Sequence, residues 1–313
     1  MKRTFLLLLA GALVAGMVAA AEKAKVRPLP ASMPTVQRKG ETVVKDIWDW
    51  PKAMIPVARK FKGTEGVVIL IGDSLTYANQ STRWAWGVSW NEAGQYTESD
   101  KAILKWSHAY EGEKDTNGWF MAKVDRPSGR SETAASGIRT DQYIKGGFHN
   151  LPSLAKVLKK FNPQVVFILL GSNDVSAGRK PADVLKDMNT IVESVINSNA
   201  IPVLTTLPPM RAKNRHERLK KINSLYLGLA AARKIPVLDL YGECVSRQGG
   251  GKWQGTLVGS DGVHLTHALA SGPPTKQNLA KCGYLLRCWT TVQKLKEVKA
   301  KVIDKAKAKP AGP

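Results

Sequence analysis

The sequence predicts an α/β fold in which helices cover both faces of a parallel central sheet. From residue 67 onward, short apolar runs rich in Val, Ile and Leu alternate with helix-like segments of 10 to 20 residues. Strands and helices that alternate in this way are typical of a parallel sheet with helical crossovers. In such a sheet, ligands bind beyond the carboxyl ends of the strands.

The predicted elements follow one another along the chain. The first strand ends in Gly-Asp-Ser, and the helix that begins at Pro181 carries its proline in the first turn, where proline is tolerated. The third strand stops before Pro208-Pro209. The predicted strands are 67–71, 164–170, 201–206 and 235–240, and the predicted helices are 151–161, 181–197 and 215–234.

The beginning of the chain is typical of a secretory signal peptide over residues 1–21. A basic Met-Lys-Arg head precedes an apolar run that ends in small residues at 18–21. An uncleaved membrane anchor is the alternative, but the run is short for a membrane span and is interrupted by glycines. No cysteine follows the expected cleavage site. We therefore expect a secreted or periplasmic protein without a lipid anchor.

The rest of the chain is long enough for one large domain. Its hydrophobic content of 43% and its nine tryptophans are typical of a globular protein. Cys244, Cys282 and Cys288 could oxidise in an exported protein, and the sequence leaves their pairing open. The expected divisions are an N-terminal arm or linker at 22–55, a domain at 56–292 with a Trp-rich insertion at about 76–130, and a basic C-terminal helix and tail at 293–313.

The formal net charge of +22 is large, and part of it lies in the Lys/Ala-rich run at 294–309. This run favours a solvated surface helix. The alternative is attraction to an anionic polymer or a membrane surface. We expect no nucleic-acid partner, because the protein is expected to be exported and shows no nucleic-acid-binding motif. The sequence shows no ligand cluster with metal spacing, so neither a metal nor a cofactor is expected.

Ser74 follows the first predicted strand and can act as a nucleophile if a base lies near it. Asp261 and His264 are three residues apart after the last strand, so the carboxylate can orient the imidazole. Asn173 and Gly137 can supply a side-chain and a backbone N–H to an oxyanion, with the N–H of Ser74 as a third donor. Taken singly, Asn173 is better explained as a helix cap and Gly137 as a turn glycine.

Taken together and in this order, the Gly-Asp-Ser-Leu, Gly-Ile-Arg-Thr, Gly-Ser-Asn-Asp and Asp-Gly-Val-His blocks resemble the SGNH or GDSL family of serine hydrolases, over about residues 65–290. The resemblance implies a flavodoxin-like three-layer α/β/α fold and hydrolysis of esters or thioesters. It also implies that Ser74 is the nucleophile, that His264 and Asp261 complete the triad, and that Ser74, Gly137 and Asn173 form the oxyanion hole.

The Trp-rich insertion bears on the substrate, because five of the nine tryptophans lie in it. Their rings either form a small core of the insertion or stack on sugar rings, and Trp84, Trp86 and Trp90 are the candidate substrate-binding residues. We therefore expect an exported esterase that removes small acyl groups, such as acetyl, from a carbohydrate. The alternatives are a lipolytic acyl-hydrolase with an apolar lid, which the polar insertion disfavours, and a non-catalytic glycan-binding protein, which the intact Ser–His–Asp set disfavours.

Overall fold

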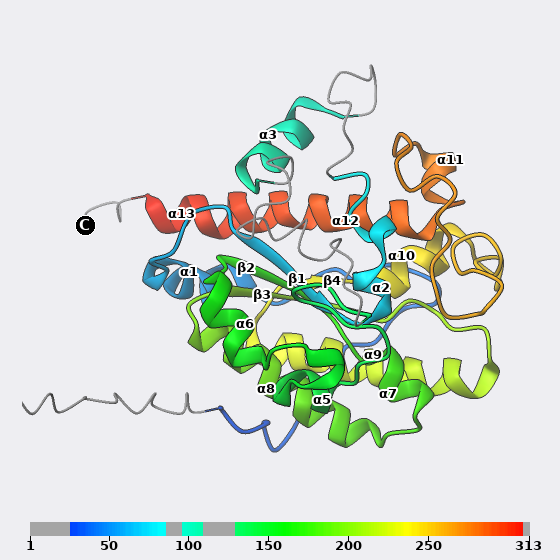
Figure 1. Cartoon of the computed structure of the whole chain (residues 1–313), viewed down its shortest axis with the longest axis horizontal. Coiled ribbons are helices and arrows are strands. Elements are labelled where there is room, and N and C mark those ends of the chain that lie inside the picture. Colours follow the sequence, from blue (N-terminus) through cyan, green and yellow to red (C-terminus); the bar gives the residue numbers. More distant parts are fainter. Residues whose placement is uncertain (1–25, 86–95, 109–128, 309–313) are drawn as a thin grey trace, which may run out of the picture.

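The computed structural model describes residues 26–85, 96–108 and 129–308 of the chain. Its centre is a parallel four-stranded sheet in the order β1-β2-β3-β4 (Figure 1). Every residue of the four strands is buried, which explains why their sequences are continuously apolar. The predicted α/β fold with a parallel sheet is confirmed. The strands are β1 (Val68–Gly72), β2 (Val165–Leu169), β3 (Ile201–Thr205) and β4 (Val237–Leu238).

After β1 the chain first pairs on one side of this strand and then on the other. Beyond the free side of β1, Gly72 forms a parallel bridge with Ala134, and the N–H of Ala135 donates to the Gly72 carbonyl at 3.3 Å. The chain therefore runs from β1 to one side at residue 134 and then crosses to the other side at β2. The carboxyl end of β1 lies at this topological switch point, which is where open α/β sheets bind their ligands.

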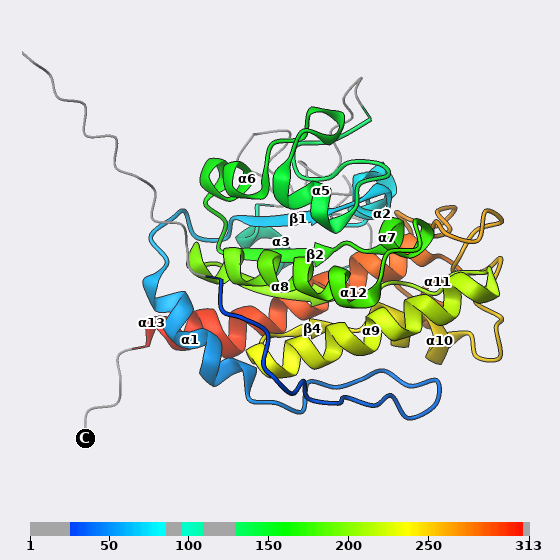
Figure 2. The same ribbon diagram turned by 90° about the horizontal axis from the view of Figure 1, so that it is seen from below.

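Two layers of helices cover the sheet (Figures 1 and 2). Helices α8 and α9 pack side by side on one face, and α12 crosses the other. The first layer contains α5 (Thr140–Lys145), α6 (Leu154–Phe161), α8 (Pro181–Asn197) and α9 (Lys213–Arg233), and the second contains α1 (Trp50–Lys60), α3 (Glu98–Trp106), α10 (Leu240–Arg247) and α12 (Gly283–Val298). Shorter helices are α2 (Ser74–Tyr77), α7 (Ser172–Ser176), α11 (Lys276–Leu279) and α13 (Asp304–Lys307). None of the described helices is both long and apolar enough to cross a membrane.

The predicted N-terminal arm packs against the domain. The Arg38 guanidinium pairs with the buried carboxylate of Asp239 at 2.5 Å, and the Trp48 indole N–H donates to the Ile235 carbonyl at 2.8 Å. Trp50 is buried and already belongs to α1. The boundary predicted between residues 55 and 56 therefore falls inside a helix, and the arm passes into the domain without a linker.

The basic C-terminal run is helical and packs one side against the core, while its lysines lie on the outer side. The boundary predicted at residue 293 falls inside α12, which continues through a π-helical turn (Lys299–Ile303) into α13. Val298 and Ile303 are buried, while Lys294 pairs with Asp46 at 3.0 Å and Lys296 with Asp100 at 2.5 Å.

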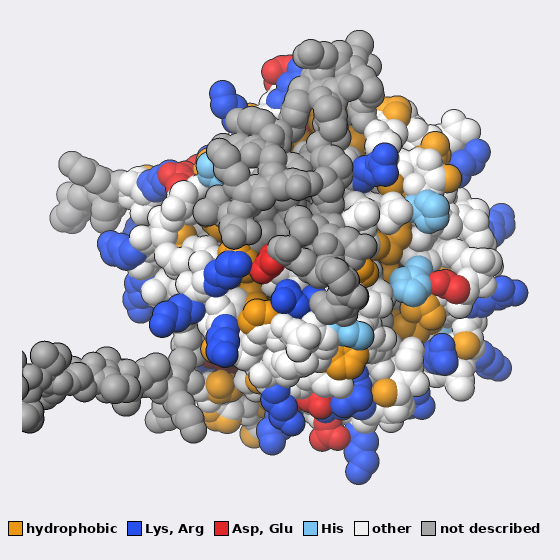
Figure 3. All heavy atoms as spheres, in the orientation of Figure 1, with side chains coloured by type: hydrophobic (Ala, Val, Ile, Leu, Met, Phe, Trp, Pro, Cys, Tyr) orange, Lys and Arg blue, Asp and Glu red, His pale blue; other side chains and the backbone are white. Residues whose placement is uncertain are grey.

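These ion pairs bear on the expected contact with an anionic polymer. Lys299, Lys301 and Lys307 are also paired with carboxylates. On the face shown in Figure 3, Lys and Arg side chains are spread around the surface and do not gather in one patch. Attraction of an anionic polymer to this helix therefore gains no support from the structure.

The three cysteines are free thiols in buried positions. Burial raises the pKa of each of them, because the thiolate loses its hydration inside the domain. The Cys282–Cys288 pair, which is closest in sequence, is not a disulfide in this structure. The described domain therefore holds together without a covalent cross-link.

Candidate active site

The turn after β1 presents Ser74 at the edge of the sheet. Ser74 is the first residue of α2, and the Asp73 carboxylate caps this helix by accepting the N–H of Leu75 at 3.0 Å. Gly72 allows the close approach of the chain, since a Cβ at this position would lie 2.0 Å from the Thr76 hydroxyl oxygen. Each residue of the Gly-Asp-Ser sequence thus has a local structural reason, and the turn leaves the serine hydroxyl directed out of the sheet.

Ser74, His264 and Asp261 form a hydrogen-bonded chain. The His264 Nε2 atom lies 2.9 Å from the Ser74 Oγ, and the Nδ1 atom lies 2.6 Å from the Asp261 Oδ2. A carboxylate at Nδ1 keeps the proton on that nitrogen, so Nε2 is left to accept the serine proton. The structure therefore brings together the three residues that the sequence nominated as nucleophile, base and orienting carboxylate.

The loop that carries His264 is organised by the same carboxylate. The Asp261 Oδ1 atom accepts the backbone N–H groups of Val263 and His264, each at 2.9 Å. Partial burial raises the pKa of Asp261, but these N–H donors and His264 outweigh it and hold the pKa below its usual value. Asp261 is therefore ionised at neutral pH, as an acceptor for the imidazole N–H requires.

Asn173 connects the second and third sequence blocks to the nucleophile turn. Its Nδ2 group donates to the Ile138 carbonyl at 3.1 Å and to the Asp73 Oδ2 at 3.3 Å. Gly137 immediately precedes Ile138 and has φ +82°, a conformation that favours glycine. Within the described residues, the backbone N–H groups of Ser74 and Gly137 donate to no acceptor. Asn173 thus links the turn of Ser74 to the loop that carries Gly137, and the two backbone N–H groups remain available as donors.

Asp174 fixes the loop that carries Gly137, and sequence analysis assigned it no role. Its carboxylate accepts the N–H of Thr140 at 3.0 Å and the Thr140 hydroxyl at 2.8 Å, and it pairs with Arg179 at 2.5 Å. The signal available in the sequence was its place beside Asn173 in the Gly-Ser-Asn-Asp block. Its partner is 34 residues away in the chain, so no local pattern reveals the contact.

Asp73 is a buried carboxyl group directly beside the nucleophile. Burial raises its pKa from 3.8 to about 6, although the N–H of Leu75 and the charge of Arg287 oppose the rise. The raised pKa means that the folded protein holds the Asp73 proton more tightly than the unfolded chain does. This group therefore stabilises the fold fully below pH 3.8, and its contribution is lost as the pH rises towards 6.

The Asp73→Asn variant removes this titration. We expect its stability relative to the wild type to increase by about 2 kcal/mol between pH 4 and pH 7.5, since only the wild type must ionise a buried carboxyl group over that interval. Urea unfolding of both proteins at a series of pH values measures the difference. Two stability curves that stay parallel across this interval would contradict the assignment.

The tryptophans do not all have the expected role. Trp84 is fully buried and stacks on Tyr96 with 5.0 Å between ring centroids, so the prediction that its ring binds substrate is wrong. The ring packs inside the domain, as in the alternative interpretation. Trp106 is half-buried on α3 and donates its indole N–H to Glu65 at 2.8 Å. The other candidates, Trp86 and Trp90, lie outside the described residues, as does Trp119.

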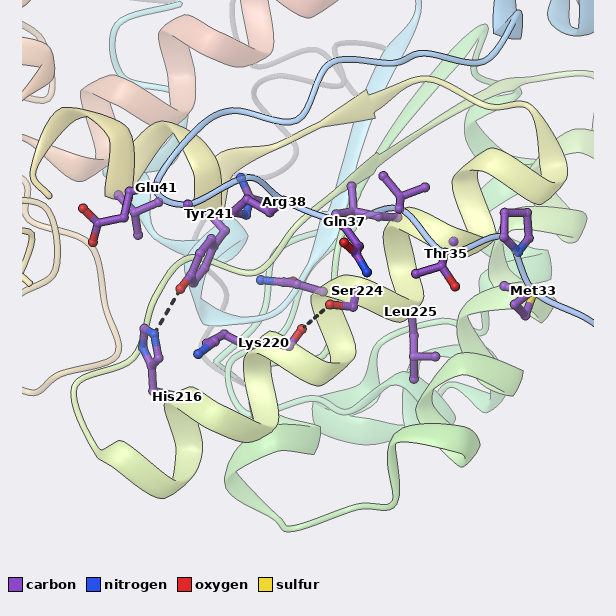
Figure 4. Close-up of a pocket in the computed structure, with 17 residues that line it drawn as sticks. Met33, Thr35, Gln37, Arg38, Glu41, His216, Lys220, Ser224, Leu225 and Tyr241 are labelled. Atoms are coloured by element: carbon purple, nitrogen blue, oxygen red, sulfur yellow. Dashed lines mark hydrogen bonds between the residues drawn. The ribbon is translucent and has the colours of Figure 1, made fainter. Parts of the chain in front are cut away.

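A cavity of about 780 Å³ lies between the N-terminal arm and helices α9 and α10 (Figure 4). Some of its charged or polar side chains are already engaged in contacts within the domain. The His216 Nε2 lies 3.1 Å from the Tyr241 hydroxyl, and Arg38 pairs with Asp239. No residue of the Ser74–His264–Asp261 chain lines it. Among the described residues, no cluster of three His, Cys, Asp or Glu side chains could hold a metal ion.

Several solved structures are similar to this chain. A lipase/acylhydrolase from Enterococcus faecalis is 18% identical with a TM-score of 0.45, over 74% of this chain and 95% of its own. A GDSL-like lipase from Bacteroides thetaiotaomicron is 15% identical with a TM-score of 0.46, over 80% and 98%. The aryl esterase of M. smegmatis is 16% identical with a TM-score of 0.41, over 73% and 98%.

A match between the sequence and a family model identifies the family of this chain. A search of curated proteins found no match. The sequence model of the GDSL-like Lipase/Acylhydrolase family matches residues 70–269, a span that begins within β1 and includes Ser74 and His264. The match covers more than half of the chain, and the protein therefore belongs to the GDSL-like lipase/acylhydrolase family of carboxylic ester hydrolases.

Proposed function

We propose that the protein is an exported serine esterase that removes small O-acyl groups, acetyl foremost, from a carbohydrate. The observation that carries the mechanism is the chain of contacts from Ser74 Oγ through the His264 imidazole to the Asp261 carboxylate, at 2.9 and 2.6 Å. Serine, base and orienting acid in this order are what acyl transfer through a covalent intermediate requires.

The proposed reaction has two steps. In the first, His264 takes the Ser74 proton while the hydroxyl oxygen attacks the ester carbonyl, and the same imidazole then gives the proton to the departing alcohol. In the second, His264 takes a proton from water, which attacks the acyl-enzyme and releases the carboxylic acid. Asp261 stays ionised throughout and stabilises the imidazolium that forms in each step.

Oxyanion stabilisation is assigned to the N–H groups of Ser74 and Gly137 and to the Asn173 side chain. The two amide hydrogens of Asn173 bond Ile138 at 3.1 Å and Asp73 at 3.3 Å, so donation to the oxyanion exchanges the longer bond, the one to Asp73. The bond to Ile138 holds the amide in place before the substrate arrives, and such preorganisation of a donor is what lowers the barrier at an oxyanion hole.

The Asn173→Ala variant is expected to lose about 10²- to 10³-fold in kcat, the usual effect of deleting one oxyanion donor. The KM for a small ester should change little, because the lost interaction strengthens mainly in the transition state. Steady-state kinetics with p-nitrophenyl acetate measure both constants. Asn173→Asp is the matched control of similar shape, and activity equal to the wild type in either variant would contradict the assigned role.

The substrate class is supported by the surroundings of the triad. The His264 and Asp261 side chains are 46% and 51% exposed, which suits attack on an ester of a bulky polar substrate. Among the described residues, the exposed large hydrophobic side chains are only Val26, Ile47 and Leu269, so no broad apolar surface for a lipid chain is present there. The leader-like sequence at 1–21 supports export.

A chain-length series tests this proposal. The wild type should hydrolyse p-nitrophenyl acetate faster than the butyrate and octanoate esters, and it should release acetate from acetylated polysaccharides. Ser74→Ala is the inactive control. A preference for the octanoate ester would favour a lipolytic acyl-hydrolase instead, and no hydrolysis of any ester would overturn the enzymatic proposal. Export is tested by locating the protein, with and without residues 1–21, in cell fractions.

A further inference from the structure

A buried arginine from the C-terminal helix reaches the nucleophile turn. Arg287 lies in α12 and is 3% exposed. Its Nη1 group donates to the Leu75 carbonyl at 2.6 Å, and its Nη2 group donates to the Thr76 hydroxyl oxygen at 2.9 Å. Leu75 and Thr76 are the two residues that follow Ser74 and are themselves fully buried.

The turn that carries Ser74 cannot hold its own shape. Helix α2 has four residues, far fewer than a helix needs to be stable by itself. Its position therefore depends on the groups that bind its ends. The Asp73 carboxylate accepts the N–H of Leu75 at the beginning of the helix, and Arg287 donates to the carbonyl of the same residue. The backbone N–H and the carbonyl of Leu75, the residue next to the nucleophile, are thus both hydrogen-bonded to side chains.

The chemistry of Arg287 indicates more than packing. Taking a guanidinium out of water is costly, and Arg287 has no carboxylate within ion-pair distance among the described residues. Both of its recorded hydrogen bonds go to the α2 turn. A planar, two-pronged donor is the side chain that can hold two acceptors of one turn in a fixed relation. The opposite charge of Asp73 across the same turn favours this arrangement.

We infer that Arg287 is a positioning residue for catalysis, which holds the α2 turn so that the Ser74 Oγ stays in line with the His264 Nε2. It touches neither the substrate nor the reacting atoms, and it acts through Leu75 and Thr76. The inference rests on the serine mechanism proposed above but not on the acyl group or the carbohydrate. Helix α12 thereby has a part in the reaction, although it lies outside residues 70–269, the span that the family model matches.

Arg287→Lys tests the two-pronged contact, because lysine keeps the charge but cannot present a fixed fork. We expect its kcat for p-nitrophenyl acetate to fall about 100-fold, the effect of a displacement of roughly 1 Å at the reacting centre, with an unchanged KM. The rate at which a fluorophosphonate labels Ser74 should fall equally. Arg233→Lys is the matched control, since Arg233 is also buried but binds Glu193 and Asn189 on the far layer. It should lower the Tm without lowering kcat.

A second pair of variants changes Thr76, which accepts a hydrogen bond from Arg287, and leaves the buried arginine unaltered. Thr76→Ser keeps the hydroxyl acceptor and should retain nearly the full kcat. Thr76→Val removes the acceptor at almost the same volume and should lose about 10-fold, since one of the two bonds remains.

Circular dichroism and thermal unfolding show which variants are folded. A folded Arg287→Lys protein with the wild-type kcat, or a Thr76→Val protein as active as Thr76→Ser, would overturn the inference. If Arg287→Lys does not fold, the Thr76 pair decides the question alone. A loss of kcat in Arg233→Lys as large as in Arg287→Lys would also overturn it, because any buried arginine would then matter equally. A wild type inactive on every ester would overturn the proposed function itself.

Discussion

Replacement of Ser74 by alanine is expected to lower kcat by about 10⁴-fold or more, the largest effect of any single change in this protein. The variant keeps the oxyanion donors and the His264–Asp261 pair but has no oxygen to form the acyl-enzyme. Ser74 makes its one recorded side-chain hydrogen bond to His264, so its removal leaves no buried group unpaired. The Tm should therefore stay close to that of the wild type.

The double variant Ser74→Ala/His264→Ala makes this prediction sharper. Nucleophile and base act as a unit, so the double variant should be about as inactive as either single variant. Ester hydrolysis followed to long times, together with mass spectrometry for an acyl adduct, measures the residual rate and the covalent step. Multiplied losses in the double variant would show that Ser74 and His264 do not act as a unit, and an acyl adduct on Ser74→Ala would show that another residue is the nucleophile.

Asp261→Asn is expected to have the second largest effect, about a 10⁴-fold loss of kcat. The asparagine oxygen can still accept the N–H groups of Val263 and His264, so the loop should keep its shape. An amide N–H₂ facing the His264 Nδ1 stabilises the tautomer whose proton is on Nε2, and that tautomer cannot accept the Ser74 proton. The change therefore separates the electronic role of the carboxylate from its structural role.

The contrast with Asp261→Ala shows whether this separation is correct. Alanine removes the loop acceptor as well as the imidazole partner, so this variant should lose thermal stability that Asp261→Asn retains. Rate profiles over pH 5 to 9 and thermal unfolding of both variants give the comparison. Asp261→Asn with near wild-type kcat would mean that another group orients His264.

The fold was predictable from the sequence where short-range patterns determine it. The apolar runs that became β1, β2 and β3, and the helix Pro181–Asn197, lie within one or two residues of their predicted bounds. The fourth strand is shorter than the predicted 235–240, because Asp239 caps α10 by accepting the N–H of Gly242. The order of the motif blocks likewise predicted which side chains would meet at the sheet edge.

Features that depend on distant partners were not predictable. The lysines near residue 294 resemble a solvated surface in sequence, because their carboxylate partners Asp46 and Asp100 lie 248 and 196 residues away. Trp84 is predicted to bind substrate because it lies in the Trp-rich insertion. Its burial depends on tertiary packing, which a single sequence does not reveal. Arg287 had no local signal at all, and only the three-dimensional contact identifies it.

The contact between Arg287 and the Ser74 turn also bears on how the active protein is made. Leu75 and Arg287 are 212 residues apart, and Ser74 and His264 are 190 residues apart, so the site is built from contacts of very long sequence separation. Such contacts form late and slow the folding of a domain. During synthesis the nucleophile emerges long before the helix that holds it. Esterase activity should therefore appear only with the final cooperative phase of refolding, after most of the secondary structure has formed.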